Sequence, residues 1–528
     1  WRGLHVVHYQ NSPYGNLCVV ENEGQYIFFQ DGVPELITPV PDLPFVEEFV
    51  HLPLLAHPEP RRLLILGGGA GGVIYEALKH PSVEAVEYEE LDPLLIELIR
   101  KFSTSLTESE LNDRRVRIQH IDGRMYLQTA RRTYDLILVG ITEPSTLQTN
   151  RFFTREFFQL ARARLNRGGI LVLGLPGSLT YTTEELADLN SSIFHTLKGV
   201  FPYVRAIPGE GTNLFLASDS AGVLSVDKEQ VVERLRQRNI RAEVVIPWYI
   251  EQKLHPGWQE WFDRFVDGRS QRINSDFRPV GVFYSVAHWS ALFAPFLRGL
   301  LRQLEKVNLW APAALLVVAL LCTFLALWSK RRRSLRAGVL FAVITTGLAG
   351  MLFDLTLIFA FQSVYGYVFS WIGLLVAAFM AGAACGALLV SRALERIQNS
   401  FPLFLKTELS IMGFAVACPL VLLAVHAFLE RVNASLLSRW LFLALSFTGG
   451  LLISAQFPLA NHLLLKERGG FTPTAGLLYA SDLLGGWLGG VIGAVVLLPL
   501  LGLLDTGIAV ALLKLSSFAV IMWVRQRL

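Results

Sequence analysis

The sequence predicts an α/β domain built around a largely parallel sheet, preceded by a small β-domain and followed by an all-α multi-pass transmembrane bundle. Three observations support this fold class. Apolar strands alternate with helices over residues 59–175, as in sheets with helices on both faces. A glycine cluster joins the first of these strands to its helix. Residues 309–525 form apolar runs that each reach about 20 residues, the length needed to cross a bilayer.

Length and composition limit the number of domains and the classes of partner that the chain could bind. A chain of 528 residues is long enough for two or more domains. Its net charge of +3 is too small to argue for nucleic acid, so no nucleic acid partner is expected. Its four cysteines form neither a disulfide framework nor a metal-binding pattern, so no metal is expected. Because the chain starts at Trp1 rather than Met, we expect it to be processed or to be part of a longer protein.

The first 58 residues are predicted to form a small β-domain and a linker helix. Apolar and polar residues alternate over 5–40 and are interrupted by turns at Gly15, Gly24 and Asp31-Gly32, which is typical of antiparallel strands. A helix over 45–56 then leads into the α/β domain. We expect the strands at 6–9, 17–21, 25–29 and 35–38. We place the domains at 1–58, 59–306 and 309–525.

A glycine motif follows the first strand of the α/β domain. The strand at 63–66 runs into Gly67-x-Gly69-x-x-Gly72, and a helix and a second strand follow. Glycines let a backbone turn tightly and approach a ligand closely. Glu90, 18 residues after Gly72, lies where a carboxylate can accept both ribose hydroxyls. The motif predicts a nucleoside site of the dinucleotide or the S-adenosylmethionine (SAM) type; a tight turn without a ligand is the alternative.

Further candidate residues follow other predicted strands. In parallel sheets, ligands bind beyond the carboxyl ends of the strands. Strands are expected at 83–88, 116–119, 134–139 and 170–175. The residues that follow strand ends, and should therefore share one crevice, are Gly67, Glu90, Asp122, Gly123 and residues 140–143.

Residues 5–305 resemble the spermidine synthase (polyamine aminopropyltransferase) family, and they resemble its membrane-fused branch most closely. The resemblance implies a Rossmann-like fold of the SAM-dependent methyltransferase type. It also implies that residues 280–297, although uncharged, form a soluble closing helix rather than a span. The stretches that carry the resemblance include Tyr9-Gln10, Asp31-Gly32-Val33, Glu90-Leu91-Asp92-Pro93, Asp122-Gly123-Arg124, Glu143-Pro144, Asn150-Arg151-Phe152, Phe283-Tyr284-Ser285, and Asn274 with Asp276-Phe277-Arg278-Pro279.

The resemblance also implies roles for the nucleoside-site residues. The donor would be decarboxylated SAM or SAM, and no metal would be needed. Glu90 would hold the ribose, and Asp122 would accept from the adenine amino group with Gly123 beside it. The turn at 67–72, with Gly67, Gly69 and Gly72, would pass under the methionine-derived tail. Gln10 and Glu47 are the candidates on the substrate side.

The amine side departs from the family pattern. Ala70 and Gly140 stand where the family has aspartates, and Phe45-Val46 replaces a Tyr-His pair. Glu143 is the remaining candidate for the catalytic base, and loss of a carboxylate base costs about two to four orders of magnitude in rate. The alternatives are that Glu143 is a solvated loop residue, that Asp122 only caps the next helix, and that His51 and His57 are packed or capping residues.

The second half is predicted to be a bundle of about seven membrane helices. Gly382-x-x-x-Gly386 and Gly485-x-x-x-Gly489 would let helices approach closely. Asp354 and Asp482 lie inside apolar spans, where charge is costly, and serve either a proton or cation path or a helix–helix hydrogen bond. The expected spans are 309–329, 335–361, 367–391, 402–429, 437–465, 473–500 and 503–524.

Loop charges predict how the protein is inserted in the cytoplasmic (inner) membrane. The Lys and Arg clusters, of which 330–333 is the strongest, lie mainly on one side. The positive-inside rule then places the C-terminus in the cytoplasm and residues 1–306 outside. One miscounted span would reverse this result, and a SAM-type ligand is cytoplasmic.

Three hypotheses for the function follow from these observations. The first is an enzyme that transfers a group from a SAM-type nucleoside to a polyamine or another small amine, with Glu143 as base. The second is an inactive subunit of a membrane complex, or a homo-oligomer, that keeps the fold. The third is an amine transporter or sensor that uses Asp354 and Asp482. Membrane lipid is a partner in each case.

Overall fold

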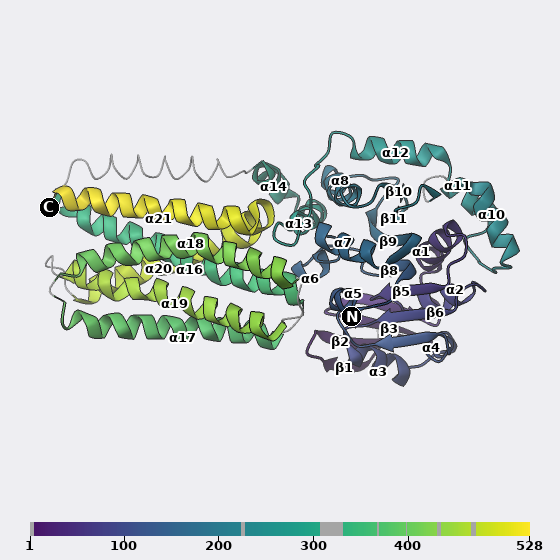
Figure 1. Ribbon diagram of the computed structural model, residues 1–528, viewed down its shortest axis with the longest axis horizontal. Helices are drawn as coiled ribbons and strands as arrows, with labels where there is room; N and C mark the ends of the chain where they lie inside the picture. The colour runs from purple at the N-terminus through teal and green to yellow at the C-terminus, as the bar shows by residue number, and fades with distance from the viewer. Residues whose placement is uncertain are drawn as a thin grey trace. The chain divides into compact units, whose positions relative to one another are not determined.

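The computed structural model describes residues 5–222, 227–306, 331–366, 369–397, 399–429, 435–465 and 471–527. The chain divides into two compact units. The first comprises Trp1–Asp276 and Val280–Pro295, and the second comprises Phe277–Pro279 and Phe296–Leu528. The first unit is mixed α/β and the second is helical, so the predicted fold class is confirmed (Figure 1).

The first unit begins with a four-stranded antiparallel sheet in the order β1-β2-β3-β4. One face of this sheet packs on the main core through Val19, Phe28 and Leu36, as the alternating pattern predicts. The turn between β3 and β4 places Asp31 and Gly32 at positive φ, which Asp tolerates and Gly favours. The strands are β1 (His5–Asn11), β2 (Asn16–Asn22), β3 (Gln25–Gln30) and β4 (Val33–Thr38).

The main sheet has seven strands in the order β10-β11-β9-β8-β5-β6-β7. The five strands from β9 to β7 are parallel, and β10 and β11 extend the sheet as antiparallel strands. The central strands are apolar on both faces because helices cover both. The strands are β5 (Arg62–Leu66), β6 (Ala85–Glu89), β7 (Val116–Gln119), β8 (Tyr134–Val139), β9 (Leu165–Gly177), β10 (Tyr203–Ile207) and β11 (Gly211–Ser218).

The helices of the first unit begin mostly at side-chain caps. Asp42, Asp92, Asp122, Thr154 and Thr183 each accept a backbone N–H bond at the first turn that follows. The helices are α1 (Leu43–Ala56), α2 (Val73–Leu78), α3 (Pro93–Lys101), α4 (Ser105–Leu111), α5 (Gly123–Thr129), α6 (Leu147–Asn150), α7 (Arg155–Ala163), α8 (Glu184–Lys198), α10 (Lys228–Gln237), α11 (Pro247–Lys253), α12 (Pro256–Val266) and α13 (Val280–Phe293).

Strand register brings the predicted site residues to one edge of the sheet. Leu66 at the end of β5 pairs with Glu89 of β6 on one side and with Val139 of β8 on the other. The next residue of each strand is therefore Gly67, Glu90 or Gly140 at the same edge. Two backbone hydrogen bonds continue the ladder, from the Gly67 N–H to the Glu89 carbonyl (3.0 Å) and from the Gly140 N–H to the Leu66 carbonyl (3.1 Å).

The described part of the second unit holds five segments that are long and apolar enough to cross a membrane. The fifth, Thr474–Gln526, is 53 residues long, and Gly502 interrupts it at φ +82°. At 1.5 Å per residue this segment would be about 80 Å long as one straight helix, well beyond the roughly 30 Å of a bilayer core. The helix α16 (Arg331–Tyr365) packs against helices on both sides of Gly502, in agreement with two separate spans there.

The described helices of the second unit from Arg331 onward lie side by side (Figure 1). The predicted span 309–329 lies outside the described residues, so the count of seven stays a prediction. The elements are α14 (Arg298–Glu305), α16 (Arg331–Tyr365), α17 (Phe369–Leu394), α18 (Phe401–Leu429), α19 (Ser435–Leu465), α20 (Phe471–Ile492), a π-helical segment (Gly493–Leu501) and α21 (Gly502–Arg527).

Small residues bring the helix backbones of the bundle together. A Cβ atom at Gly382 or Gly386 of α17 would collide with the carbonyl of Phe447 or Leu451 in α19. A Cβ atom at Gly485 of α20 would collide with α16. The close approach predicted for these glycine motifs is therefore confirmed.

Candidate functional site

The glycine turn after β5 packs directly against the end of β8. Gly67, Gly68, Gly71 and Gly72 all have positive φ. A Cβ atom on Gly140 would collide with the carbonyl of Gly67 and would lie 3.1 Å from the Cα of Gly68. The two loops therefore meet backbone to backbone, and position 140 has no room for a side chain.

A buried carboxylate occupies the backbone donors that follow the glycine turn. Glu110 of α4 accepts from the N–H groups of Gly71 (2.9 Å), Gly72 (2.6 Å) and Tyr75 (3.1 Å). Burial raises its pKa to about 7, although these backbone bonds act in the opposite direction. N–H groups of this kind hold the phosphates of dinucleotides in other proteins. Here they are already used, which disfavours a pyrophosphate ligand.

Glu90 lies buried at the carboxyl end of β6. Its Oε2 accepts from the Tyr88 hydroxyl (2.7 Å), and its Oε1 accepts from the Asp92 N–H (3.3 Å). Burial raises the pKa of Glu90 to about 7, against the lowering effect of the Tyr88 bond. The ring of Tyr88 packs under Gly69, where a Cβ atom would lie 2.7 Å from the ring. Glu90 and the glycine turn are thus joined through one tyrosine.

Asp122 is both a helix cap and half of a buried ion pair. Its Oδ1 accepts from the N–H groups of Arg124 (3.1 Å) and Met125 (3.0 Å) at the start of α5. Its Oδ2 lies 2.7 Å from Nη1 of Arg151, and both side chains are buried. The capping role weighed as an alternative is therefore present. Gly123 follows it, and a Cβ atom there would lie 2.9 Å from the end of the Leu66 side chain, which would have to shift.

Residues of three separate sequence motifs, together with Thr154, meet in one buried network beside Asp122. Arg124 forms a two-pronged ion pair with Asp276, which also accepts from the Thr154 hydroxyl (2.7 Å). The amide of Asn274 donates to the side chain of Asn150 (2.9 Å). Motif spacing alone does not reveal these pairings, because their members are more than 120 residues apart.

Glu143 is held by hydrogen bonds from two side chains of α13, the last helix of the first unit. Its Oε1 accepts from the Ser285 hydroxyl and from Nε1 of Trp289, both at 2.5 Å. Both donors lie on α13, one helical turn apart, and both are neutral. Glu143 is therefore held in one orientation, in contrast to the alternative of a freely solvated loop residue, and Oε2 is the oxygen available to an incoming group.

The two candidates on the substrate side differ in their surroundings. Glu47 is fully buried in α1, and its carboxylate accepts from the N–H groups of Glu243 (2.8 Å), Val244 (2.8 Å) and Val245 (2.9 Å). Gln10 is exposed on β1 and contacts the ring of His8 (3.1 Å). Their roles toward a substrate stay predictions.

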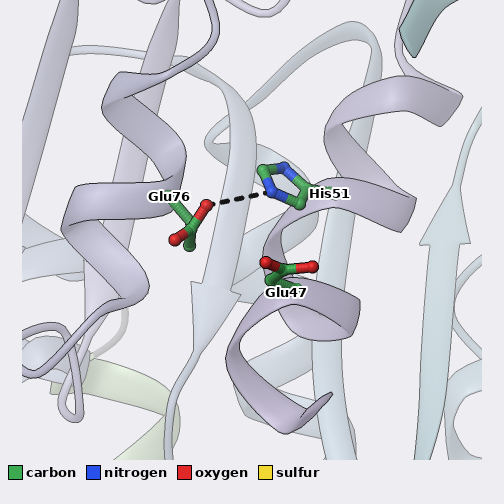
Figure 2. A group of neighbouring side chains, drawn as sticks. All are labelled: Glu47, His51 and Glu76. Atoms are coloured by element: carbon green, nitrogen blue, oxygen red, sulfur yellow. Dashed lines mark hydrogen bonds and ion pairs between the residues drawn. The ribbon is translucent and has the colours of Figure 1, made fainter. Parts of the chain in front are cut away.

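Glu47, His51 and Glu76 form a buried group of potential metal ligands (Figure 2). The hydrogen-bond partners fix the tautomers of the histidines here. Arg238 can only donate to Nδ1 of His80 (3.3 Å), so Nε2 of His80 carries the proton and donates to Nδ1 of His51 (3.0 Å). Nε2 of His51 then donates to Glu76 (3.1 Å). Both nitrogens of His51 are used, which disfavours a metal at this geometry.

Among its described residues, the second unit contains a buried ion pair that sequence analysis missed. Glu408 of α18 and Lys514 of α21 lie 2.9 Å apart, and both side chains are fully buried. Thr346 and Ser517 complete the network with hydrogen bonds of 2.8 and 2.7 Å. The predicted intramembrane residues Asp354 and Asp482 lie outside this network: Oδ1 of Asp354 is buried without a hydrogen bond in the described chain, and Asp482 lies against Gly347.

Comparison with known proteins agrees with the resemblance seen in the sequence. The family described as the spermine/spermidine synthase domain matches residues 44–221. A polyamine aminopropyltransferase of Moorella thermoacetica is 32% identical over 271 residues, which cover 49% of this chain and 92% of that protein. One of Nitrosomonas europaea is 32% identical, over 40% of this chain and 62% of that protein. The crystal structure of spermidine synthase from Thermotoga maritima aligns with 50% of this chain and 87% of its own, at 23% identity and a TM-score of 0.41.

Proposed function

The chain belongs to the polyamine aminopropyltransferase (spermidine synthase) family, and on this premise we propose that it is a membrane-bound transferase. In this proposal it moves an aminopropyl group from decarboxylated SAM to an amine. The observation that carries the proposal is the common sheet edge at which Gly67, Glu90 and Gly140 align, with Glu143 three residues further on.

The donor side of the proposed site fits a nucleoside without phosphates. Glu90 offers a buried carboxylate to the two ribose hydroxyls. Asp122 keeps a lone pair on Oδ2 for the adenine amino group beside its bond from Arg151. The engaged N–H groups of Gly71 and Gly72 leave no place for a pyrophosphate. A tail that carries positive charge and no carboxylate, as in decarboxylated SAM, suits this arrangement better than SAM does.

Glu143 acts as the general base on the amine. The amine nitrogen attacks the carbon of the aminopropyl group that is bonded to the sulfonium sulfur, so a C–N bond forms. The C–S bond breaks, its electron pair stays on sulfur, and neutral methylthioadenosine leaves. The proton of the amine passes to Oε2 of Glu143, while Ser285 and Trp289 keep Oε1 in place.

Calorimetric titration of the full chain in detergent tests the donor half of this proposal. We expect heat on addition of methylthioadenosine and of decarboxylated SAM, weaker binding of SAM, and loss of binding in Glu90→Ala. Glu84→Ala is the matched control and should bind normally, because Glu84 is exposed and precedes β6, whereas Glu90 follows it. No heat with any of the three ligands would exclude an aminopropyltransferase.

One observation favours a second candidate, a binding subunit without transferase activity. Position 140, three residues before the proposed base Glu143, has no room for a carboxylate because Gly67 packs against it. Such a subunit would bind methylthioadenosine but would not transfer an aminopropyl group. Incubation with decarboxylated SAM and an amine panel, followed by mass spectrometry, separates the two candidates.

A further inference from the structure

An exposed aromatic stack begins at the proposed base. Trp289 donates from Nε1 to Glu143 (2.5 Å), and its ring stacks on Phe293 with centroids 5.5 Å apart and planes at 10°. Trp289 is 43% exposed and Phe293 is 77% exposed. The opposite face of α13, with Phe283 and Tyr284, is buried. An apolar surface therefore leads away from the carboxylate that would receive the amine.

Four other carboxylates of the first unit have both of their oxygens bonded, and Glu90 is assigned to the ribose of the donor. Glu47 and Glu110 each bind three backbone N–H groups, and Asp122 is paired with an arginine. Asp276 is likewise paired with an arginine. Glu143 differs from these four, because both of its donors bind Oε1 and none in the described chain binds Oε2. Glu143 thus offers one negative charge beside the aromatic stack.

We propose that the acceptor is a primary monoamine with an apolar or aromatic tail, an inference that rests on the proposed transferase function. Its nitrogen lies at Oε2 of Glu143, and its tail lies along Trp289 and Phe293. The charge of Glu143 complements one ammonium group, and the stack complements a hydrocarbon chain.

A diamine of equal length fits this surface poorly. Its second ammonium group would lose hydration against the exposed rings of Trp289 and Phe293. Each additional buried methylene of a monoamine should instead raise kcat/KM by about fourfold, until the stack is covered. A longer apolar chain should therefore raise kcat/KM, whereas a second terminal charge should lower it.

The test compares hexylamine with hexane-1,6-diamine as acceptors for the full chain in detergent, with decarboxylated SAM as donor. Methylthioadenosine release gives the rate, and mass spectrometry identifies the aminopropylated product. We expect kcat/KM to be at least about tenfold higher for hexylamine, in keeping with the cost of an unpaired charge. Equal or better use of the diamine would overturn the inference and leave the transferase function standing.

Phe293→Glu, with Phe293→Leu as its matched control, tests the surface itself. A carboxylate at position 293 should shift the preference toward the diamine by about tenfold, whereas leucine should keep the preference for hexylamine. Methylthioadenosine affinity reports whether each variant is folded. Transfer to no amine at all, with methylthioadenosine still bound, would refute the transferase function and this inference with it. An unchanged preference in Phe293→Glu would refute the inference alone.

Discussion

At the scale of single residues, Gly140 shows that a backbone contact can keep a carboxylate out of a candidate catalytic position. Sequence analysis identified position 140 as the place of a missing acid. The structure adds that the carbonyl of Gly67 fills the space where a side chain would begin. Replacing the glycine by aspartate is therefore a steric change as well as a change of charge.

We expect Gly140→Asp to lower the stability of the first unit by about 1–3 kcal/mol, the usual effect of overpacking, and not to improve transferase activity. Thermal unfolding and the affinity for methylthioadenosine measure the two effects. Gly222→Ala is the control, because a Cβ atom there meets only the Ser220 hydroxyl oxygen at 3.5 Å. A variant as stable as the wild type would show that the glycine turn can move away.

Glu90 gives a second prediction at this scale, because its pKa of about 7 lies in the range of ordinary assays. Ribose hydroxyls donate to the ionised carboxylate, so methylthioadenosine affinity should rise as the pH rises through 7 and fall below it. In Glu90→Gln this pH dependence should disappear, and binding should be weaker at every pH. Calorimetry between pH 6 and 8 checks both. A pH step that persists in Glu90→Gln would assign it to another group, such as Glu89, whose pKa burial raises to about 8.

At the scale of elements, a chain of hydrogen bonds joins α1, α2 and α10. It runs from Arg238 through His80 and His51 to Glu76, which also pairs with Lys79. Burial, together with His51 and Arg238, lowers the pKa of His80 well below its usual value. His80 is therefore neutral in the folded protein and takes up a proton more readily in the unfolded chain.

A depressed pKa stabilises the fold above the unfolded value and loses its effect as the pH falls. The stability difference between wild type and His80→Gln should thus be largest above about pH 6.5, the ordinary pKa of histidine, and should shrink at lower pH. Thermal unfolding of both proteins at several pH values measures this difference. A difference that grows on acidification would mean that His80 is charged in the folded state.

The ion pair between α18 and α21 predicts strong coupling between two candidate membrane helices. Removing one partner leaves a buried, unpaired charge, so Glu408→Gln or Lys514→Met alone should cost about 3–5 kcal/mol. The double variant should be less destabilised than the sum of the two, because neither charge remains. Unfolding in detergent across this double-mutant cycle gives the coupling energy. Additive effects would show that the pair does not stabilise the bundle.

At the scale of the whole molecule, the proposed function and the loop charges disagree about the side of the membrane. The donor is cytoplasmic, whereas the positive-inside count places residues 1–306 outside. The proposed function therefore predicts that cysteine at the exposed position Ser109 is protected from an impermeant maleimide in intact cells. It should be labelled after permeabilisation, and the wild-type chain measures the background. Labelling in intact cells would support the charge count and refute a cytoplasmic transferase.

Sequence reasoning reached the parts of this structure that depend on local pattern. The ends of β5 and β8 lie as predicted, because apolar runs and glycines mark them directly, whereas β6 ends at Glu89, one residue later than predicted. The partners of the site residues were not predictable in this way. Glu110 comes 38 residues after Gly72, on a helix with no unusual local feature, and the roles of Ser285 and Trp289 appear only once α13 folds back. Lys514 was hidden by the high apolar content of its span.

The carboxyl group of Glu110 occupies the backbone N–H groups of Gly71, Gly72 and Tyr75, where an external anion would otherwise bind. A cell contains abundant inorganic phosphate and free nucleotides, which compete for exposed amide clusters in many enzymes. Here the competing acceptor, a carboxyl group with a pKa of about 7, is covalently part of the protein and cannot be diluted away. Phosphate and ATP should accordingly be poor inhibitors, a resistance that needs no lid and no charged gate.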